Sequence, residues 1–408
     1  MTAAQNRVRR EERVNAAGLG AATVAARILA RIAVGFTLVL LAAHARSLFL
    51  EDLGGEPLRP DFSAFWGAAR LALEAGPLAP FDDALLKEIR RLPPDDTAMT
   101  LFWLYPPAFL GLLAPLGTLP FAWAWLAFAA ASTAALAFAL SRVPDATLGE
   151  RLFVLVAPAT LMTLALGQNA ALTCALAVGA VEALRRRRSV LAGLVISGLT
   201  IKPQLGLMIP LALAAERRWL AFAAAAGFSI LLTGASFAVV GADYLSALLE
   251  SSGKIGDAVA AGQLGKLMIS AYGVAIAFGL PRDAALAVQI LQLLLVSALL
   301  WRLWSDASAD FERKAAGLLF AIPLATPYAL HYELVFAAAG AFYLARSAAS
   351  RAPWVQLLLA ALWLSPVIGA AAVDTVHFVF VAPLLLAAFL RAALGRPFAA
   401  RSEAPGVA

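Results

Sequence analysis

The sequence is poor in charged residues. Only 14% of its residues are charged, whereas a typical soluble domain has about 25%. Hydrophobic residues make up 62% of the chain, and the mean hydropathy is +0.81. A water-soluble globule of 408 residues cannot bury that much apolar surface. Lipid is therefore the expected solvent for most of the protein.

The chain also lacks the residue patterns of common metal, redox and nucleotide sites. Its one cysteine, Cys174, has no partner for an intramolecular disulfide, and its three histidines form no cluster with zinc-site spacing. Neither a P-loop nor a glycine-rich dinucleotide motif is present. The sequence therefore predicts no metal and no cofactor.

The positive charge is scattered. The formal net charge of +6 comes mostly from arginines in short clusters between apolar runs, without the alternating basic and aromatic residues of a nucleic-acid-binding surface. In a membrane protein, such clusters mark the loops that stay in the cytoplasm. We therefore expect membrane lipid, and not nucleic acid, as a partner.

Apolar runs recur from residue 28 to residue 394. Alanine and leucine dominate these runs and β-branched stretches are few, which favours helices over barrel strands. We expect an all-α polytopic membrane protein with about ten to thirteen transmembrane helices. Several runs are shorter than the roughly 20 residues that a spanning helix needs, so some are expected to join across a polar kink.

The basic clusters predict the orientation in the membrane. A single transmembrane domain, 27–395, is expected between cytoplasmic tails at 1–26 and 396–408, in a bacterial inner membrane. The clusters placed in the cytoplasm lie at 7–13, 185–188, 217–218, 302–314, 346–351 and 391–401.

Two external loops follow from this orientation. The first, 51–101, is expected to contain the catalytic candidate and two short amphipathic helices, at 62–74 and 82–92. The second covers 241–266.

One part of this topology is inconsistent. If every apolar run between residues 102 and 184 crosses the membrane, the four arginines at 185–188 fall outside the cytoplasm, which the charge rule disfavours. One of the short runs is therefore expected to be re-entrant or fused to its neighbour. The sequence leaves open which one.

Five polar segments interrupt the apolar runs, and polar groups inside a membrane are costly enough to mark function. The first is Arg59-Pro60-Asp61, where Asp61 fits a general base in a partly dry cleft and also fits an N-cap for the following helix. The second is Tyr105-Pro106-Pro107, which is also compatible with an ordinary helix start carrying an interfacial tyrosine.

The third segment is Gln168-Asn169, which offers hydrogen bonds to sugar hydroxyls or phosphate, or else forms a turn and cap. The fourth is Lys202-Pro203-Gln204. A lysine at this depth binds an anion such as phosphate, snorkels to the interface, or pairs with a buried carboxylate.

The fifth segment runs from Thr326 to Glu333. His331 and Glu333 fit a ligand site or a proton relay, although structural packing explains them as well. One histidine and one glutamate make a poor metal site, since no third ligand lies nearby.

Taken in order, these five segments resemble glycosyltransferase family 87, a group similar to polyprenol-phosphate-mannose-dependent α-mannosyltransferases with the GT-C membrane fold. The resemblance spans residues 55–345. It rests on Asp61-Phe62, Tyr105-Pro106-Pro107, Gly167-Gln168-Asn169, Lys202-Pro203-Gln204, Thr326-Pro327-Tyr328 and Tyr332-Glu333.

The resemblance implies a GT-C-type bundle that transfers a hexose, by analogy mannose, from a polyprenyl-phosphate donor to an acceptor hydroxyl on the non-cytoplasmic side. An acid in the first external loop is the catalytic base of such enzymes, and Asp61 matches it. Two departures weaken the assignment. The same loop holds other acids, and Glu333 stands where an aspartate is expected. The other acids are Asp82, Asp83, Asp95 and Asp96.

The chemistry assigns roles to the remaining residues. A polyprenyl-phosphate leaving group needs a positioned cation, for which Lys202, His331 and Arg59 are the candidates, and it needs no metal. The acceptor is a glycan or glycolipid. The residues expected to contact substrate are Tyr105, Gln168, Asn169, Gln204, Tyr328, Tyr332 and Glu333.

Two other functions fit the composition. A transporter or flippase of lipid-linked sugars would also be polytopic, but such proteins are commonly built from paired halves, which this sequence does not show. A non-catalytic membrane protein is the second alternative, and it predicts that Asp61 lies far from any cavity.

Overall fold

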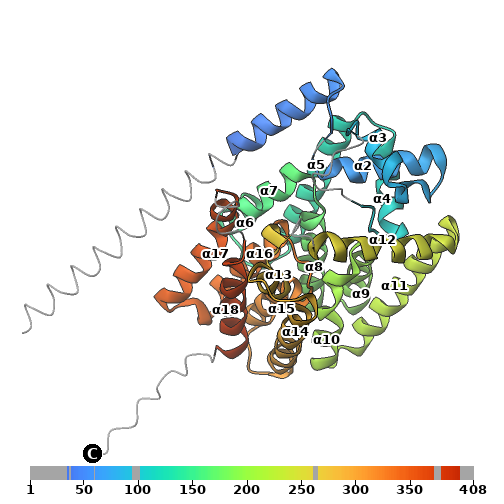
Figure 1. The fold of residues 1–408 in the computed structure, drawn as a ribbon. Helices are drawn as coiled ribbons and strands as arrows, with labels where there is room; N and C mark the ends of the chain where they lie inside the picture. Colours follow the sequence, from blue (N-terminus) through green and yellow to red (C-terminus); the bar gives the residue numbers. More distant parts are fainter. Residues whose placement is uncertain are drawn as a thin grey trace, which may run out of the picture.

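The computed structural model describes residues 35, 38–58, 60–93, 102–260, 265–371 and 378–395, without the side chains of 255–260 and 266. All regular secondary structure in this part of the chain is helical, and it contains no strand (Figure 1). Its one β-type contact is an isolated antiparallel bridge between Met268 and Leu330. The predicted all-α fold is confirmed.

The first half of the protein contains the elements around the segment predicted to be the first external loop. Residues 38–54 are helical and precede a series of further helices. These are α2 (Phe62–Ala75), η1 (Ala79–Phe81), α3 (Asp83–Ile89), α4 (Pro107–Gly117), α5 (Phe121–Ser141), α6 (Leu148–Leu155), α7 (Pro158–Leu166), α8 (Ala170–Arg185), α9 (Ser189–Ser197), η2 (Gly198–Ile201), η3 (Pro203–Gly206) and α10 (Met208–Ala215).

The second half holds most of the central core. Its elements are α11 (Trp219–Val240), α12 (Asp243–Ala260), η4 (Gly265–Leu267), α13 (Ala271–Ala277), α14 (Arg282–Ser305), α15 (Phe311–Ala325), η5 (His331–Glu333), α16 (Leu334–Arg346), η6 (Ala348–Ser350), α17 (Pro353–Ala371) and α18 (Val381–Leu394). In Figure 1, α15 lies beside α14 and α18, which agrees with the packing of these helices.

Several helices are long and apolar enough to cross a bilayer. They are α5, α11, α14 and α17, and the bent pair α6 and α7, with an angle of 46° between them, makes a fifth candidate span. The described part of α11 faces outward with apolar side chains, as shown by Ile230 and Val239, which are 73% and 85% exposed. Such a surface requires lipid, so the protein is a multi-pass membrane protein.

The expected count of ten to thirteen spans stays a prediction. Four further apolar helices are shorter than a bilayer is thick, so additional crossings would combine two short helices in series. The segment 189–215 illustrates this, because α9 and α10 are separated by two 3₁₀ turns, η2 and η3.

The two ends of α8 define the two ends of the bundle. The helix starts at Ala170 and ends at Arg185, a rise of about 24 Å at 1.5 Å per residue. At its C-terminal end, Arg185 Nη1 lies 2.8 Å from Glu312 Oε1. Arg218 Nη1 donates to Leu184 O over 3.2 Å at the same end.

Further ion pairs extend this polar region. Lys314 Nζ lies 3.0 Å from Glu216 Oε1, and Arg346 Nη1 lies 2.7 Å from Glu150 Oε1. Four of the predicted cytoplasmic clusters therefore gather in one region, which we call the basic end. These are 185–188, 217–218, 302–314 and 346–351.

α4 and α5 belong to the segment whose topology the sequence left inconsistent. α4 has 11 residues, about 16 Å, and does not cross a core of about 30 Å. α5 runs from Ala122, whose N–H donates to Asp52 Oδ2 over 3.2 Å, to Arg142, whose carbonyl accepts from Arg186. The arginines at 185–188 therefore lie at the end of α5 opposite to Asp52. The number of crossings between residues 102 and 184 stays a prediction.

Both helices predicted in the first loop are present, and one helix in the second predicted loop was missed. α2 and α3 correspond to the expected amphipathic helices at 62–74 and 82–92. The second predicted loop, 241–266, is mostly occupied by α12. α12 packs toward the first loop, because Lys254 Nζ lies 2.7 Å from Asp83 Oδ2.

Candidate active site

A cavity of about 130 Å³ lies where five interhelical segments meet. These segments precede α2 and α4, join α7 to α8 and η2 to η3, and join α15 to α16. The cavity is at the end of α8 opposite to the basic end. It is lined by seven of the predicted site residues: Asp61, Tyr105, Gln168, Lys202, Gln204, Tyr328 and Tyr332.

Asp61 is held inside this cavity. It occupies the N-cap position of α2, but its side chain makes no cap hydrogen bond. Its Oδ2 instead accepts a hydrogen bond of 2.8 Å from Gln168 Nε2. Burial raises the pKa of the Asp61 carboxyl, because a charged carboxylate loses hydration there, whereas the hydrogen bond from Gln168 and the charges of Arg90 and Lys202 lower that pKa.

Gly167 places Gln168 next to Asp61. It ends α7 in a left-handed conformation with φ of +67°, which glycine adopts without steric cost. A Cβ at this position would lie 2.3 Å from Cβ of Phe62, the residue that follows Asp61. The absence of a side chain therefore permits both the turn and the close approach of α7 to α2.

Lys202 enters the cavity from a break in the helical segment 189–215. Its backbone is extended, with φ of −147° and ψ of 73°, and Pro203 begins the next 3₁₀ turn without an N–H. Lys202 Nζ lies 2.7 Å from Glu333 Oε1, and the two side chains are 7% and 1% exposed. Among the alternatives that the sequence left open, the structure shows the pair with a buried carboxylate.

This pair leaves bonding capacity on the lysine. Nζ also lies 5.0 Å from the centre of the Tyr332 ring, in the geometry of a cation–π contact. An ammonium group has three donors, so Lys202 is able to bind an anion in the cavity without releasing Glu333.

Amide atoms at the start of α8 have no partner. Asn169 is fully buried, and neither its side-chain nitrogen nor its oxygen reaches hydrogen-bond geometry, although the Tyr105 hydroxyl lies nearby. Gln168 Oε1 is likewise unpartnered. Buried polar atoms without partners are rare, so these atoms are suited to a bound hydroxyl or phosphate oxygen. Asn169 and Glu333 do not line the cavity, but each interacts with a residue that does. Asn169 neighbours Tyr105, and Glu333 pairs with Lys202.

An aromatic wall closes the cavity on the side of α12. Trp103 Nε1 donates to Tyr244 Oη over 2.6 Å, and that hydroxyl donates to Tyr105 O over 3.0 Å. The Tyr105 ring meets the Phe65 ring edge to face, with 5.0 Å between centres. The missed helix α12, which carries Tyr244, therefore supports the segment that precedes α4.

The three predicted cations have different positions. His331 does not line the cavity but packs against Phe378 and Tyr332, with ring centres 4.9 and 5.4 Å apart. Burial lowers its pKa to about 4, so the imidazole is neutral near pH 7. Arg59 lies outside the described residues. Lys202 is the one of the three that the structure places in the cavity.

Arg90 was not identified from the sequence. It is 2% exposed, its Nε donates to Ser63 Oγ over 2.7 Å, and its charge acts on Asp61. As one of two adjacent arginines after a short polar helix, it has the pattern of a solvated pair. Only the packing of α3 against α2 shows that it is buried.

The other acids of the first loop have structural roles or are not described. Asp82 caps α3 by accepting from the N–H groups of Ala84 and Leu85, over 2.9 and 3.1 Å. Asp83 pairs with Lys254. Asp95 and Asp96 lie outside the described residues. Among the described acids of this loop, Asp61 is the one that lines the cavity.

Comparison with known families decides the assignment. The family model of glycosyltransferase family 87 matches residues 103–327, more than half of the chain. The chain belongs to glycosyltransferase family 87. The resemblance found in the sequence is thereby confirmed, and the protein is a membrane glycosyltransferase.

The family 87 match covers four of the five polar segments at least in part. It includes Tyr105, Gln168, Lys202 and Gln204, but it ends before Tyr328 and begins after Asp61. No curated protein matches the chain. No solved structure matches it either.

Proposed function

We propose that this family 87 protein transfers a hexose, with mannose as the first candidate, from a polyprenyl-phosphate donor to an acceptor hydroxyl. The observation that carries this proposal is the shared cavity of Asp61 and Lys202, at the end of the bundle opposite to the basic end. A buried carboxylate beside a buried ammonium supplies the base and the phosphate-binding cation that such a transfer requires.

Asp61 acts as the general base. As the bond between the sugar C1 and the donor phosphate oxygen breaks, the acceptor oxygen bonds to C1 and loses its proton to an Asp61 carboxylate oxygen. The hydrogen bond from Gln168 occupies Oδ2 and orients the carboxylate. The other oxygen, Oδ1, is then in position to receive the proton.

Lys202 stabilises the leaving group. The polyprenyl phosphate departs with the bonding electrons, and a positioned ammonium offsets the charge that develops on its oxygen. Glu333 holds Lys202 in place before the donor binds. Because phosphate leaves readily and Lys202 supplies positive charge, the proposed reaction uses no metal.

The sugar lies against the remaining polar residues. Gln168, Gln204, Tyr105, Tyr328 and Tyr332 line the cavity and offer hydrogen bonds to hydroxyl groups. The volume of about 130 Å³ is below the roughly 300–1,000 Å³ of typical small-molecule sites. Binding of a complete sugar phosphate therefore requires part of the wall to move, and the non-helical segment 102–106 is the candidate.

The basic end faces the cytoplasm of a bacterial cell in this proposal, because short loops rich in arginine stay on that side. The cavity then opens on the non-cytoplasmic side of the inner membrane, where the acceptor is a glycan or glycolipid.

The test is release of polyprenyl phosphate by purified protein incubated with a panel of radiolabelled polyprenyl-phosphate sugars and a glycolipid extract that supplies acceptor hydroxyls. We expect release of polyprenyl phosphate with at least one hexose donor, and no transfer of labelled sugar from the matching nucleotide sugars. Turnover of a nucleotide sugar, with none of the lipid-linked donors consumed, would overturn the proposed donor class.

A further inference from the structure

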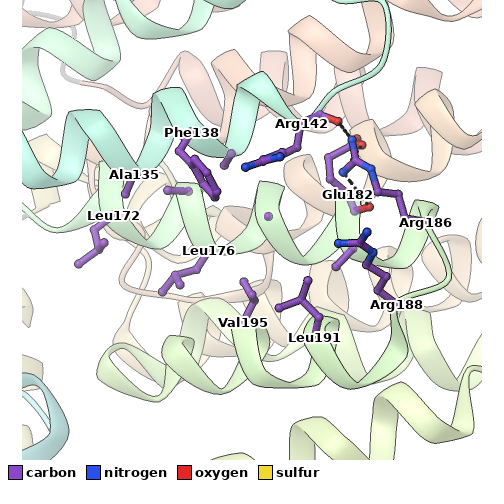
Figure 2. A pocket seen from close by; sticks show the side chains of 14 residues that line it. Ala135, Phe138, Arg142, Leu172, Leu176, Glu182, Arg186, Arg188, Leu191 and Val195 are labelled. Atoms are coloured by element: carbon purple, nitrogen blue, oxygen red, sulfur yellow. Dashed lines mark hydrogen bonds and ion pairs between the residues drawn. The ribbon is translucent and has the colours of Figure 1, made fainter.

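A second hollow, of about 480 Å³, lies at the basic end (Figure 2). α8 forms its floor, and α5 and α9 form its walls. It shares no lining residue with the cavity that contains Asp61. We call it the α5–α9 groove.

Most of the α5–α9 groove is apolar and open at the side. Phe138 on α5 and Leu191 on α9 are 61% and 42% exposed, so these walls face the surroundings of the protein. Between the walls, small residues on α8 leave space. The apolar lining consists mainly of Ala135, Phe138, Leu172, Leu176, Leu191 and Val195.

Three arginines stand at one end of the groove. Arg186 and Arg188 lie beside Glu182 in Figure 2, and the Arg142 guanidinium lies over the Phe138 ring, 4.3 Å from its centre. Within the described part of the chain, Arg142 and Arg188 have no carboxylate within ion-pair distance, and Arg186 Nη1 lies 3.8 Å from Glu182 Oε2. Three positive groups therefore face a single negative one.

The negative group is already engaged elsewhere. Glu182 is 1% exposed, and its Oε1 accepts from Arg185 Nε over 3.1 Å and from the Tyr343 hydroxyl over 2.8 Å. Both partners lie outside the groove lining. The arginines in the groove thus retain positive charge that the protein does not neutralise.

The length of the groove fits one leaflet of a bilayer. Its floor on α8 extends from Leu172 to Glu182, a rise of about 15 Å at 1.5 Å per residue. The hydrocarbon core is about 30 Å thick, so each leaflet contributes about 15 Å. A lipid whose phosphate lies among the arginines would therefore have its acyl chain beside the apolar part of the groove.

We propose that the α5–α9 groove binds an anionic membrane glycerophospholipid. The headgroup phosphate lies between Arg142, Arg186 and Arg188, and one acyl chain follows α8 toward Leu172. The arginines and the apolar part of the groove together define the ligand. A soluble phosphate would contact only the arginines, and a neutral lipid would use only the apolar part.

The test is lipid binding by the purified full-length protein, measured by native mass spectrometry with phosphatidylglycerol and phosphatidylcholine at equal concentrations. We expect preferential binding of phosphatidylglycerol. Each of Arg142→Gln and Arg188→Gln should weaken it about fivefold, and the double variant about 25-fold. The matched control is Arg187→Gln, in the same loop but outside the lining, which should leave binding unchanged.

A second variant tests the apolar part separately. Ala135→Phe adds a ring to the α5 wall and leaves every arginine in place. Because the ring fills the space for the acyl chain, this variant should no longer retain phosphatidylglycerol. A thermal unfolding measurement establishes that each variant is folded. Inorganic phosphate at millimolar concentration should not displace the lipid.

Three results would overturn the proposal. Equal retention of the two lipids would show that the arginines do not select the headgroup. An equal loss in Arg187→Gln and Arg188→Gln would indicate diffuse attraction. Displacement by inorganic phosphate would show that the headgroup position binds a free anion.

Discussion

The two ends of α8 carry charge in different ways. At the basic end, Arg185 is shared by Glu182 and Glu312, and neighbouring ion pairs connect further helices. At the other end, the cavity contains one ion pair, between Lys202 and Glu333, together with Asp61 and neutral amides. The basic end has more charge, but much of it is partly exposed. The cavity has less, and nearly all of it is buried.

This difference indicates where a single substitution is most damaging. Exposed ion pairs contribute about 0–1 kcal/mol, because water already solvates both partners. Buried charges depend on each other, so removal of one leaves the other unpaired in a medium of low polarity. The predictions below compare the two ends, beginning with the largest expected effect.

The first prediction concerns the proposed base. Asp61→Asn keeps the shape and the hydrogen bond from Gln168 but cannot take a proton, so transfer should fall by about 10²- to 10⁴-fold. Radiolabel transfer checks this. Asp82→Asn is the matched control, because asparagine also caps helices and Asp82 lies outside the cavity lining. Equal activity of both variants would remove Asp61 from this role.

The second prediction concerns the buried pair. Lys202→Met leaves Glu333 buried without a partner and should destabilise the fold by about 3–5 kcal/mol. Adding Glu333→Gln should restore most of the stability, but not transfer. Denaturation in detergent and the transfer assay separate the two effects. A single variant as stable as wild type would show that the pair is hydrated.

The third prediction concerns the turn beside Asp61. Gly167→Ala places a Cβ against Phe62 in a left-handed conformation, and should cost about 1–3 kcal/mol. Gly111→Ala, in α4 with no atom near its Cβ, is the control and should stabilise by about 0.5–1 kcal/mol. The unfolding midpoints of both variants are compared with that of the wild type. Midpoint shifts of the same sign in the two variants would contradict the close approach of α7 to α2.

The fourth prediction concerns pH. Asp61 acts in its ionised form, so transfer should fall as the pH drops through its raised pKa. Gln168→Leu removes a hydrogen bond that lowers this pKa, and the acid limb of the rate should move to higher pH. Gln204→Leu, which lines the same cavity without bonding to Asp61, should leave the acid limb in place. An acid limb that stays in place in Gln168→Leu would show that Gln168 does not influence the pKa of Asp61.

The smallest effect is expected at the basic end. Arg346→Gln breaks the pair with Glu150, whose side chains are 16% and 38% exposed, and should change stability by about 0–1 kcal/mol. Unfolding of this variant beside Lys202→Met tests the comparison directly. A larger loss of stability in Arg346→Gln than in Lys202→Met would contradict the view that buried charges in the cavity matter more than ion pairs at the basic end.

Secondary structure was predictable where the local sequence alone determines it. The amphipathic helices α2 and α3 were expected in the first loop, and Pro203 marks the break beside Lys202. α12 was missed because its serines and Gly253 weaken the helical pattern, whereas its stability depends on contacts such as that between Ser251 and the Trp103 carbonyl.

The site was predictable as a set of residues but not as a geometry. Family resemblance named Asp61, Gln168 and Lys202 together, although they are separated by many residues and share no periodicity. Spacing along the sequence does not say how far apart two segments lie in space. The Lys202–Glu333 pair therefore remained one alternative among several. Arg90 was missed for the same reason, because its burial depends on the packing of two helices.

The most direct test separates donor binding from transfer in one experiment. Wild type, Asp61→Asn and the Lys202→Met/Glu333→Gln double variant are each mixed with one equivalent of radiolabelled polyprenyl-phosphate hexose. Bound donor is measured first, and released polyprenyl phosphate is measured after a glycolipid extract is added as the source of acceptor hydroxyls. We expect Asp61→Asn to bind the donor without releasing polyprenyl phosphate, and the double variant to lose binding. Release by Asp61→Asn at the wild-type rate, or full donor binding by the double variant, would contradict the roles assigned to this cavity.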